Sequence, residues 1–557
     1  MITWRSLRSG LVVVTVCWVV LFWRLGHVGL MDDEAQYARL TQEMAAQGDW
    51  LVPRSEGVPN IDKPVFFHWV QGLTTALIPD EELAARLPSA LAAVALFGLI
   101  GWLGSTCAGS LTGRGAWLML ATTPATFLLG RTGFMDMLFT ALLFGAVALL
   151  TRALMGSSGW AQAGAVVCVA LAVLTKGPIA VVLVSVWLGT LWLIGGEARL
   201  SVMRLSLGRC ALGLCALSAP WFLWMYAQYP DLFVNDYLGR GHMGYLSRRS
   251  SASSSQWTFY LRMFMTSFFP WSFIALGYGV DILRRWRRGV QIPLWESGLW
   301  LWMAVVLAVF TPVAFRVDRY IYPAAPACCL LAIRGWLAAS AEARWREFAA
   351  TRAAVLMVAL AFVGGGVFVW SSLPSLAVPL PRAVGLLPAL MVIGGLAIIA
   401  DMVRRGGGMA KLAAWPVGLL LTIYASVVFI GLPILRAGSP VEQIGRFIAD
   451  EAGDDAAVGV LGLDRWEVGL AYYLHHSPQR LRDAEDALRF TSVSSPRWII
   501  VRREAQKLAP SGGCVTLSLP AIVGTKGRGI RTQVWGDVVV IQYNANKDYV
   551  AATCPVP

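Results

Sequence analysis

Long apolar runs dominate this sequence and limit what it can fold into. Runs long enough to cross a bilayer as a helix, about 17–25 residues, recur along most of the 557 residues. Only 14% of the residues are charged, whereas soluble domains carry about a quarter. The sequence therefore predicts an all-α polytopic membrane bundle of about 13 helices. The runs fall near residues 11–30, 84–104, 114–131, 133–151, 161–176, 177–195, 208–227, 260–282, 294–314, 320–339, 353–373, 383–401 and 412–432.

Clusters of basic residues indicate the orientation of this bundle, because cytoplasmic loops carry an excess of Lys and Arg. With the N-terminus inside, the clusters all fall on the cytoplasmic side, and an odd number of helices places residues 433–557 outside. The net charge of +13 fits such loops and contacts with anionic membrane lipid. No nucleic-acid motif accompanies it, so we expect no nucleic-acid partner. The clusters are Arg5 and Arg8; Arg199, Arg204 and Arg209; Arg284, Arg285, Arg287 and Arg288; Arg344, Arg346 and Arg352; and Arg404, Arg405 and Lys411.

The end of the chain differs from the rest. Residues 1–435 form the predicted transmembrane part, and residues 436–557 are expected to be a small outer α/β domain of ordinary size. This tail contains Cys514 and Cys554. An oxidising compartment would allow them to form a disulfide; two unrelated thiols are the alternative.

Polar residues gather in the segments that this topology places on the outer side. Any one of them could cap a helix or extend its charged end to the interface. Together they predict one polar site at the outer end of the bundle, whose acids and bases suit a phosphate and a general base. The residues are Asp32, Asp33, Glu34, Tyr37, Asp62, Lys63, His68, Arg131, Asp136, Lys176, Arg240, His242, Arg248, Arg249, Arg316, Asp318, Arg319, Tyr320 and Tyr322.

Several short motifs resemble the bacterial branch of the protein O-mannosyltransferase-like superfamily, and especially the aminoarabinose transferases that modify lipid A. The acidic motif Met-Asp-Asp-Glu-Ala-Gln-Tyr-Ala contains Asp33 and Glu34, and Asp62-Lys63-Pro64 follows it. The aspartate that opens the fourth span and the Thr-Lys-Gly turn match Asp136 and Lys176. The basic-Tyr-hydrophobic-Tyr-Pro segment matches residues 319–323. The resemblance covers roughly 1–435 and implies a GT-C fold glycosyltransferase that uses a polyprenyl-phosphate sugar.

The resemblance also implies roles for these residues. Asp33, with Glu34 and Asp136, would be catalytic, and Asp33 would act as the base. An ordinary aspartate has a pKa near 3.9, so partial desolvation would have to strengthen it. Lys63, Lys176 and Arg319 would stabilise the donor phosphate. Donor binding would further involve Tyr37, Tyr320, Tyr322 and Arg131, and acceptor binding would involve Arg240, Arg248 and Arg249.

Each role has a structural alternative. Asp33 could cap the following helix, Asp136 could pair with Arg131, and Arg319 could pair with Asp318. Two departures from the family pattern preserve charge: Asp62 replaces the usual glutamate, and Arg319 stands where many members have lysine. No cofactor is firmly required, although Asp62 and His242 are ligand types that could hold a divalent metal ion.

The expected function is transfer of 4-amino-4-deoxy-L-arabinose from a polyprenyl phosphate to lipid A or another envelope glycan, on the periplasmic face of a bacterial inner membrane. One alternative keeps this donor class and changes the acceptor to a protein or polysaccharide. Another is a transporter of a lipid-linked sugar. Transporters tend to place charges near the bilayer midplane in repeated halves, whereas here the charges collect at one face and no internal repeat is visible.

Overall fold

Helices make up most of the protein, and many of them are of membrane length. In the part of the chain that the computed structural model describes, eight helices are long and apolar enough to cross a membrane, or nine if one bent pair counts as a span. Two shorter apolar helices, α9 (Ile179–Ile194) and α16 (Leu294–Phe310), stand among them. The described residues are 12, 14–156, 158–244, 256–340, 347–372, 385–405, 414–453, 456–463, 466–493, 496–526 and 531–543.

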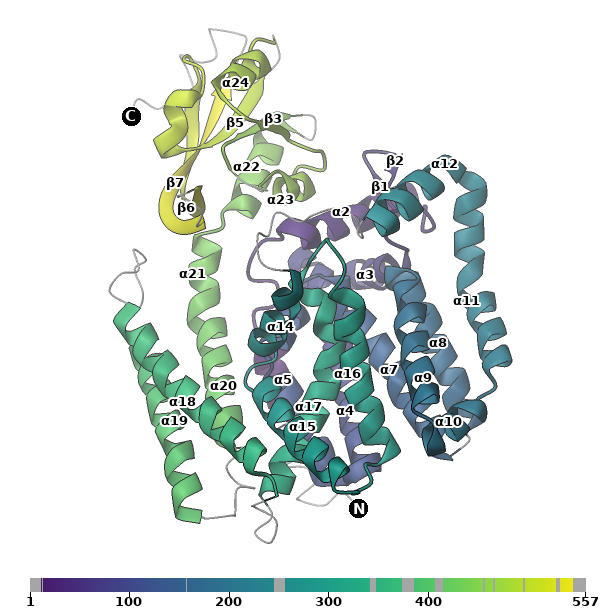
Figure 1. The fold of residues 1–557 in the computed structure, drawn as a ribbon. Coiled ribbons are helices and arrows are strands. Elements are labelled where there is room, and N and C mark those ends of the chain that lie inside the picture. The colour runs from purple at the N-terminus through teal and green to yellow at the C-terminus, as the bar shows by residue number, and fades with distance from the viewer. Residues whose placement is uncertain are drawn as a thin grey trace.

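The remaining helices of the bundle follow the predicted apolar runs in order (Figure 1). They are α4 (Glu81–Ala108), α5 (Ser110–Ala121), α6 (Pro124–Gly130), α7 (Met135–Gly156), α8 (Gly159–Lys176), α10 (Gly196–Met203), α11 (Leu207–Gln228), α14 (Gln256–Ser267), α15 (Trp271–Arg287), α17 (Ala325–Ala339), α18 (Ala349–Ser372), α19 (Leu386–Arg405), α20 (Ala414–Ser426) and α21 (Leu432–Ala437).

Two predicted runs are interrupted in the structure. The run near 114–131 is divided into α5 and α6, and the run near 260–282 is divided into α14 and α15, whose axes differ by 111°. Both breaks precede or contain a proline, Pro124 and Pro270. Proline lacks a backbone N–H and disturbs the turn before it, so each run continues as a second helix in a new direction.

One end of the bundle is covered by two helices that lie across it (Figure 1). These are α2 (Asp32–Gln47) and α3 (Phe66–Leu77), with a short hairpin of β1 (Arg54–Ser55) and β2 (Val58–Pro59) between them. On the same side, α12 (Pro230–Leu232) continues into the helical segment Phe233–Met243. The polar residues predicted to share one side lie mainly at this end.

The C-terminal domain stands beyond α2 and has the predicted α/β character (Figure 1). Its sheet has the order β4-β3-β5-β7-β6, in which β3 is parallel to both neighbours and β7 is antiparallel to both of its own. Alternate residues of β3, β5 and β7 enter two different cores, as the period of two in a strand requires. The elements are α22 (Val441–Ala452), β3 (Ala457–Leu461), α23 (Trp466–Tyr473), β4 (Gln479–Leu481), α24 (Ala484–Thr491), β5 (Arg497–Arg502), β6 (Cys514–Lys526) and β7 (Arg531–Tyr543).

The predicted disulfide lies in this domain. Cys514 is disulfide-bonded, whereas Cys554 lies outside the described residues. The pairing of these two residues therefore stays a prediction.

Candidate active site

The helix α2 begins with the acidic motif. Asp32, Asp33 and Glu34 fill its first turn, where the unpaired N–H groups and the helix dipole favour carboxylates. The N-cap position itself is occupied by Met31, so Asp33 is not the cap residue. Because Asp33 and Tyr37 are four residues apart, they lie on one face of α2, and both line a cavity.

Four charged side chains from four segments form a continuous network beside Asp33. Arg319 forms an ion pair with Asp33 through Nη2, and its Nε lies 3.1 Å from Oδ2 of Asp136. Asp136 in turn pairs with Lys176, whose ammonium lies 4.8 Å from the centre of the Tyr320 ring. Acids and bases alternate, so each buried charge faces an opposite one. The Asp136 carboxylate thus pairs with Lys176 and Arg319, where Arg131 was the alternative. The Arg319 guanidinium pairs with Asp33 and Asp136, where Asp318 was the alternative.

The network lines a polar cavity of about 370 Å³ at the end of the bundle. This position brings together the starts or ends of α2, α3, α7 and α8 with the segment Asp318–Ala324. Of the residues that were assigned a role it contains Asp33, Asp62 and six others, namely Tyr37, Lys63, Asp136, Lys176, Arg319 and Tyr320. The described lining residues are Asp33, Gln36, Tyr37, Leu40, Asn60, Asp62, Lys63, His68, Asp136, Lys176, Phe315, Val317, Arg319 and Tyr320.

The Asp-Lys-Pro motif supplies a further cation on the cavity wall. The Lys63 ammonium lies 2.8 Å from a carboxylate oxygen of Asp62. The Lys63 side chain is only 15% exposed, whereas that of Asp62 is 49% exposed. The Lys63 side chain is therefore the more deeply placed of the two, and Asp62 lies nearer the opening of the cavity. The Lys63 ammonium could bind a second anion in the cavity in addition to Asp62.

Tyr37 stands between the carboxylates of this cavity. Burial raises the pKa of its hydroxyl well above the ordinary value, and the nearby charges of Asp136 and Asp33 raise it further. The hydroxyl therefore remains protonated at neutral pH. It can donate a hydrogen bond to a sugar or phosphate oxygen, and it is not suited to act as a base.

His68 is a cavity residue to which the motifs assigned no role. Its Nδ1 lies 2.9 Å from the Thr41 hydroxyl, which in turn donates a hydrogen bond to Gln71 over 2.7 Å. Burial lowers the pKa of His68 to about 4, so the ring is neutral at physiological pH. His68 is already among the polar residues predicted for the outer side, and its i, i+3 spacing from Gln71 places both residues on the buried face of α3.

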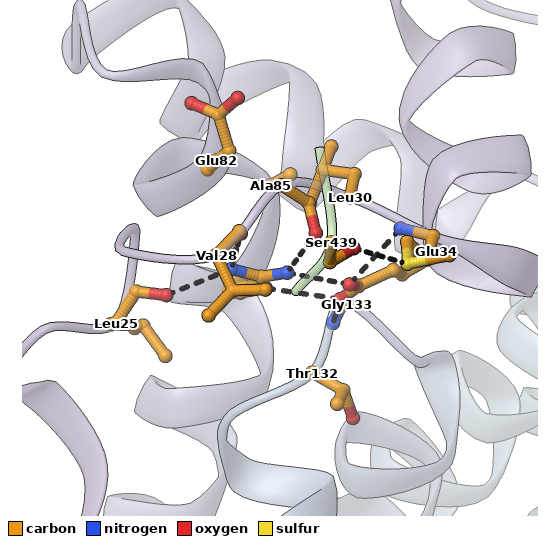
Figure 2. A network of polar contacts seen from close by, with 12 residues as sticks. Leu25, Val28, Leu30, Glu34, Glu82, Ala85, Thr132, Gly133 and Ser439 are labelled. Carbon is orange, nitrogen blue, oxygen red and sulfur yellow. Dashed lines mark hydrogen bonds and ion pairs between the residues drawn. The ribbon is translucent and has the colours of Figure 1, made fainter. Parts of the chain in front are cut away.

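Glu34 does not line the cavity, although it belongs to the same motif as Asp33. Its carboxylate accepts hydrogen bonds from Arg86 of α4, from Nε over 3.1 Å and from Nη2 over 2.6 Å. It also accepts the backbone N–H of Gly133 over 2.8 Å and that of Met31 over 3.4 Å. Figure 2 shows the carboxylate between the start of α2 and the Gly133 turn.

Arg86 completes this buried centre by holding the chain that precedes α2. Its guanidinium donates to the carbonyls of Leu25, Val28 and Gly29 over 3.0, 2.6 and 3.2 Å. With the two bonds to Glu34, all five guanidinium donors are used. The pair therefore ties three segments together, and Gly133 lies three residues before Asp136. Glu34 and Arg86 thus fix the relative positions of Asp33 and Asp136, and neither is among the described residues that line the cavity.

Two other predicted residues lie away from the cavity. Arg131 is buried and donates to the carbonyls of Val20 and Trp23, over 3.3 and 2.7 Å, so it fastens the end of the first apolar run. The Tyr322 hydroxyl shares a hydrogen bond of 2.8 Å with Thr126. Tyr322 lines a separate cavity of about 280 Å³ on the other side of Arg319.

The predicted metal and acceptor residues are only partly visible. Arg248 and Arg249 lie outside the described residues, and the side chains of Arg240 and His242 are also not described. Asp62 alone offers one carboxylate, already paired with Lys63. Among the residues that the structure does describe, no group of three or more His, Cys, Asp or Glu is placed to hold a metal ion. Both assignments stay predictions.

Comparison with known proteins finds relatives of this chain in sequence. Residues 62–224 match the family described as dolichyl-phosphate-mannose-protein mannosyltransferase. An undecaprenyl phosphate-alpha-4-amino-4-deoxy-L-arabinose arabinosyl transferase from Pectobacterium carotovorum is 25% identical over 90% of this chain and 92% of its own. One of the same name from Pseudomonas fluorescens is 26% identical over 54% of this chain and 50% of its own. This second relative and two further arabinosyl transferases, from Pseudomonas fluorescens and Edwardsiella ictaluri, are each matched over only about half of their own length.

Solved structures share the predicted fold class, an all-α membrane bundle with a small C-terminal α/β domain. The number of about 13 membrane helices stays a prediction. ArnT from Cupriavidus metallidurans, bound to undecaprenyl phosphate, superposes with a TM-score of 0.70 at 19% identity, covering 96% of this chain and 97% of its own. An oligosaccharyltransferase from Archaeoglobus fulgidus gives a TM-score of 0.53 at 12% identity, covering 89% and 70%. This chain therefore shares the fold of these two structures.

Proposed function

We propose that this chain is a membrane glycosyltransferase that moves 4-amino-4-deoxy-L-arabinose from a polyprenyl phosphate to a phosphate of lipid A, on the periplasmic face of a bacterial inner membrane. The observation that carries the proposal is the alternating network of Asp33, Arg319, Asp136 and Lys176 on the wall of one polar cavity. The names of the relatives supply the sugar and the carrier lipid; the cavity supplies the chemistry that such a donor requires.

The cations of the cavity suit the phosphate of the donor. Within the described chain the ion pairs of Arg319 use Nη2 and Nε, which leaves Nη1 to meet a phosphate oxygen. Lys63 and Lys176 line the same cavity. When the bond between the sugar and the phosphate breaks, its electron pair leaves on the phosphate oxygen. Preorganised cations stabilise this developing charge and so lower the barrier.

Asp33 acts on the other reactant. An oxygen of the acceptor bonds to the anomeric carbon as the polyprenyl phosphate departs from the opposite side, which inverts that carbon. Where the acceptor oxygen carries a proton, that proton passes to the Asp33 carboxylate. Where the acceptor is an ionised phosphate, no proton moves, and Asp33 acts by holding the Arg319 cation beside the phosphates. Arg319 holds Asp33 at the cavity, so the carboxylate is in place before the acceptor enters.

The first experiment supplies purified protein with undecaprenyl-phosphate aminoarabinose and a lipid A precursor, and detects the added sugar by mass spectrometry. Asp33→Asn is tested alongside and should lower transfer about a hundredfold or more, because it removes the carboxylate that takes the acceptor proton and holds Arg319, while the protein remains folded. Donor consumed without modified lipid A would redirect the proposal to a protein or polysaccharide acceptor. Absence of any donor turnover would reject it.

A further inference from the structure

The C-terminal domain contacts the segment of the chain immediately before α2, the helix that carries Asp33. The segment Leu25–Met31 joins the first apolar run to α2, and Arg86 holds three of its carbonyls from the bundle side. From the opposite side, the backbone N–H of Leu30 donates a hydrogen bond of 2.7 Å to the hydroxyl of Tyr473, at the end of α23. Leu30 lies only three residues before Asp33.

The Tyr473 hydroxyl is itself fixed in place. It donates a hydrogen bond of 3.0 Å to the buried Glu82 carboxylate in the first turn of α4, so one hydroxyl links the C-terminal domain, the segment before α2 and the helix that carries Arg86. Tyr473 is only 4% exposed. A Cβ atom added at Gly29 would lie 3.1 Å from its hydroxyl oxygen, which shows how closely the segment packs against it.

The packing of α2 extends this contact to the active site. Leu30, Ala35 and Ala38 are buried in the same hydrophobic core as α22, α23 and one face of the C-terminal sheet. Asp33 and Tyr37 line the polar cavity instead. Thus α2 has the C-terminal domain on one side and the substrate cavity on the other. Ser439, just before α22, adds a contact of 3.0 Å to the sulfur of Met31 (Figure 2).

We propose that Tyr473 is a positioning residue for Asp33 and that the C-terminal domain is thereby part of the active-site scaffold. The Tyr473 hydroxyl and the Arg86 guanidinium hold the segment Leu25–Met31 from opposite sides, so the first turn of α2 cannot shift against Asp136 and Arg319. This role rests on the proposed transferase function. It differs from simple docking of the domain, because docking also uses contacts remote from this hydroxyl.

Those remote contacts make a selective test possible. Arg39 of α2 donates to the Ser477 hydroxyl over 2.9 Å, and the Ser477 N–H donates to Glu56 over 2.6 Å. Tyr473→Phe keeps these contacts and the aromatic packing, and removes only the two hydrogen bonds of the hydroxyl. The matched control is Tyr472→Phe, which removes a hydroxyl from the neighbouring buried residue of the same helix.

The test measures kcat and the donor KM for full-length wild type, Tyr473→Phe and Tyr472→Phe, together with amide hydrogen exchange of peptides covering residues 25–34. A small displacement of a reacting group is costly, so Tyr473→Phe should lower kcat about tenfold, change the donor KM less than about twofold, and speed exchange in these peptides. Tyr472→Phe should change none of the three. A conservative return of a hydrogen-bonding group, Tyr473→His, should recover part of the lost kcat.

Two results would overturn the inference. One is an active wild type with an unchanged kcat in Tyr473→Phe; the other is an equal loss in Tyr472→Phe, which would indicate general loosening of the domain. If the wild type itself transfers no sugar, the proposed function fails and the exchange measurement decides alone. In that case, unchanged exchange at residues 25–34 in Tyr473→Phe rejects the positioning role, and faster exchange confined to that variant supports it.

Discussion

Asp33 of α2 and Asp136 of α7 are bridged by a single guanidinium, that of Arg319. Its Nη2 pairs with Asp33, and its Nε lies 3.1 Å from Asp136. Two carboxylates at one cavity would repel each other, and a delocalised cation with a rigid set of donors is the side chain best able to hold both. The bridge therefore sets the distance between the proposed base and the residue that holds Lys176.

Replacing Arg319 should separate charge from geometry. Arg319→Gln removes the cation, so it should lower kcat about a hundredfold, in the range seen when one electrostatic donor is removed from an active site. Arg319→Lys keeps the charge on one flexible ammonium and should recover part of that loss. The measurement is steady-state transfer with both variants at matched concentrations of folded protein. Equal activity of the two variants would show that the charge of Arg319 is not what matters.

Glu34→Gln should behave differently from Asp33→Asn, although the two residues are adjacent. Glu34 is the buried partner of Arg86, and breaking a buried ion pair on one side typically costs about 3–5 kcal/mol of stability. We expect a markedly lower unfolding temperature, while turnover per folded molecule stays within about tenfold of the wild type, below the loss expected for a general base.

The measurement pairs a thermal-unfolding assay in detergent with transfer normalised to folded protein. A stable Glu34→Gln protein with transfer as low as that of Asp33→Asn would instead assign Glu34 a direct role in the chemistry. The outcome therefore distinguishes a positioning residue from a catalytic one within a single motif.

The gathering of the cavity residues could be predicted because each lies at the end of an apolar run. Asp136 opens one run and Lys176 closes another, and helices that alternate across a membrane return such positions to the same side. Asp33 and Lys63 lie in the segment between the first two runs, which has to stay on that same side. No knowledge of packing is needed for this step, only the number and direction of the helices between the motifs.

The partner of Glu34 could not be predicted in this way. Arg86 lies inside the run predicted near 84–104, where a lone arginine reads as an interfacial anchor. Three of the five hydrogen bonds that its guanidinium donates go to backbone carbonyls in a segment without regular structure. Tyr473 likewise lies more than 400 residues from Leu30 along the chain. Contacts of this kind have no periodic signal, so only the tertiary structure shows them.

His68 should make the stability of the folded protein depend on pH. Burial lowers the pKa of its ring to about 4, against an ordinary value of 6.5. Between these two values the unfolded chain binds a proton that the folded chain does not, so the free energy of unfolding falls as the pH falls. From pH 7 to pH 5 this one group should lower the free energy of unfolding by about 2 kcal/mol. Well above pH 6.5 the ring is neutral in both states and lowers it no further.

The prediction is checked with His68→Gln, which keeps a side chain able to hydrogen-bond Thr41 and cannot titrate. Thermal unfolding of wild type and variant is followed at pH 7 and pH 5. The wild type should lose more stability than the variant between the two conditions. Only the wild type has a ring that takes up a proton on unfolding at pH 5, and the glutamine of the variant cannot. Parallel losses in both proteins would show that His68 is protonated in the folded state at pH 5. That result would mean that water or a carboxylate of the cavity, such as Asp62, reaches the ring, and that His68 carries a charge at the pH of an acidified compartment.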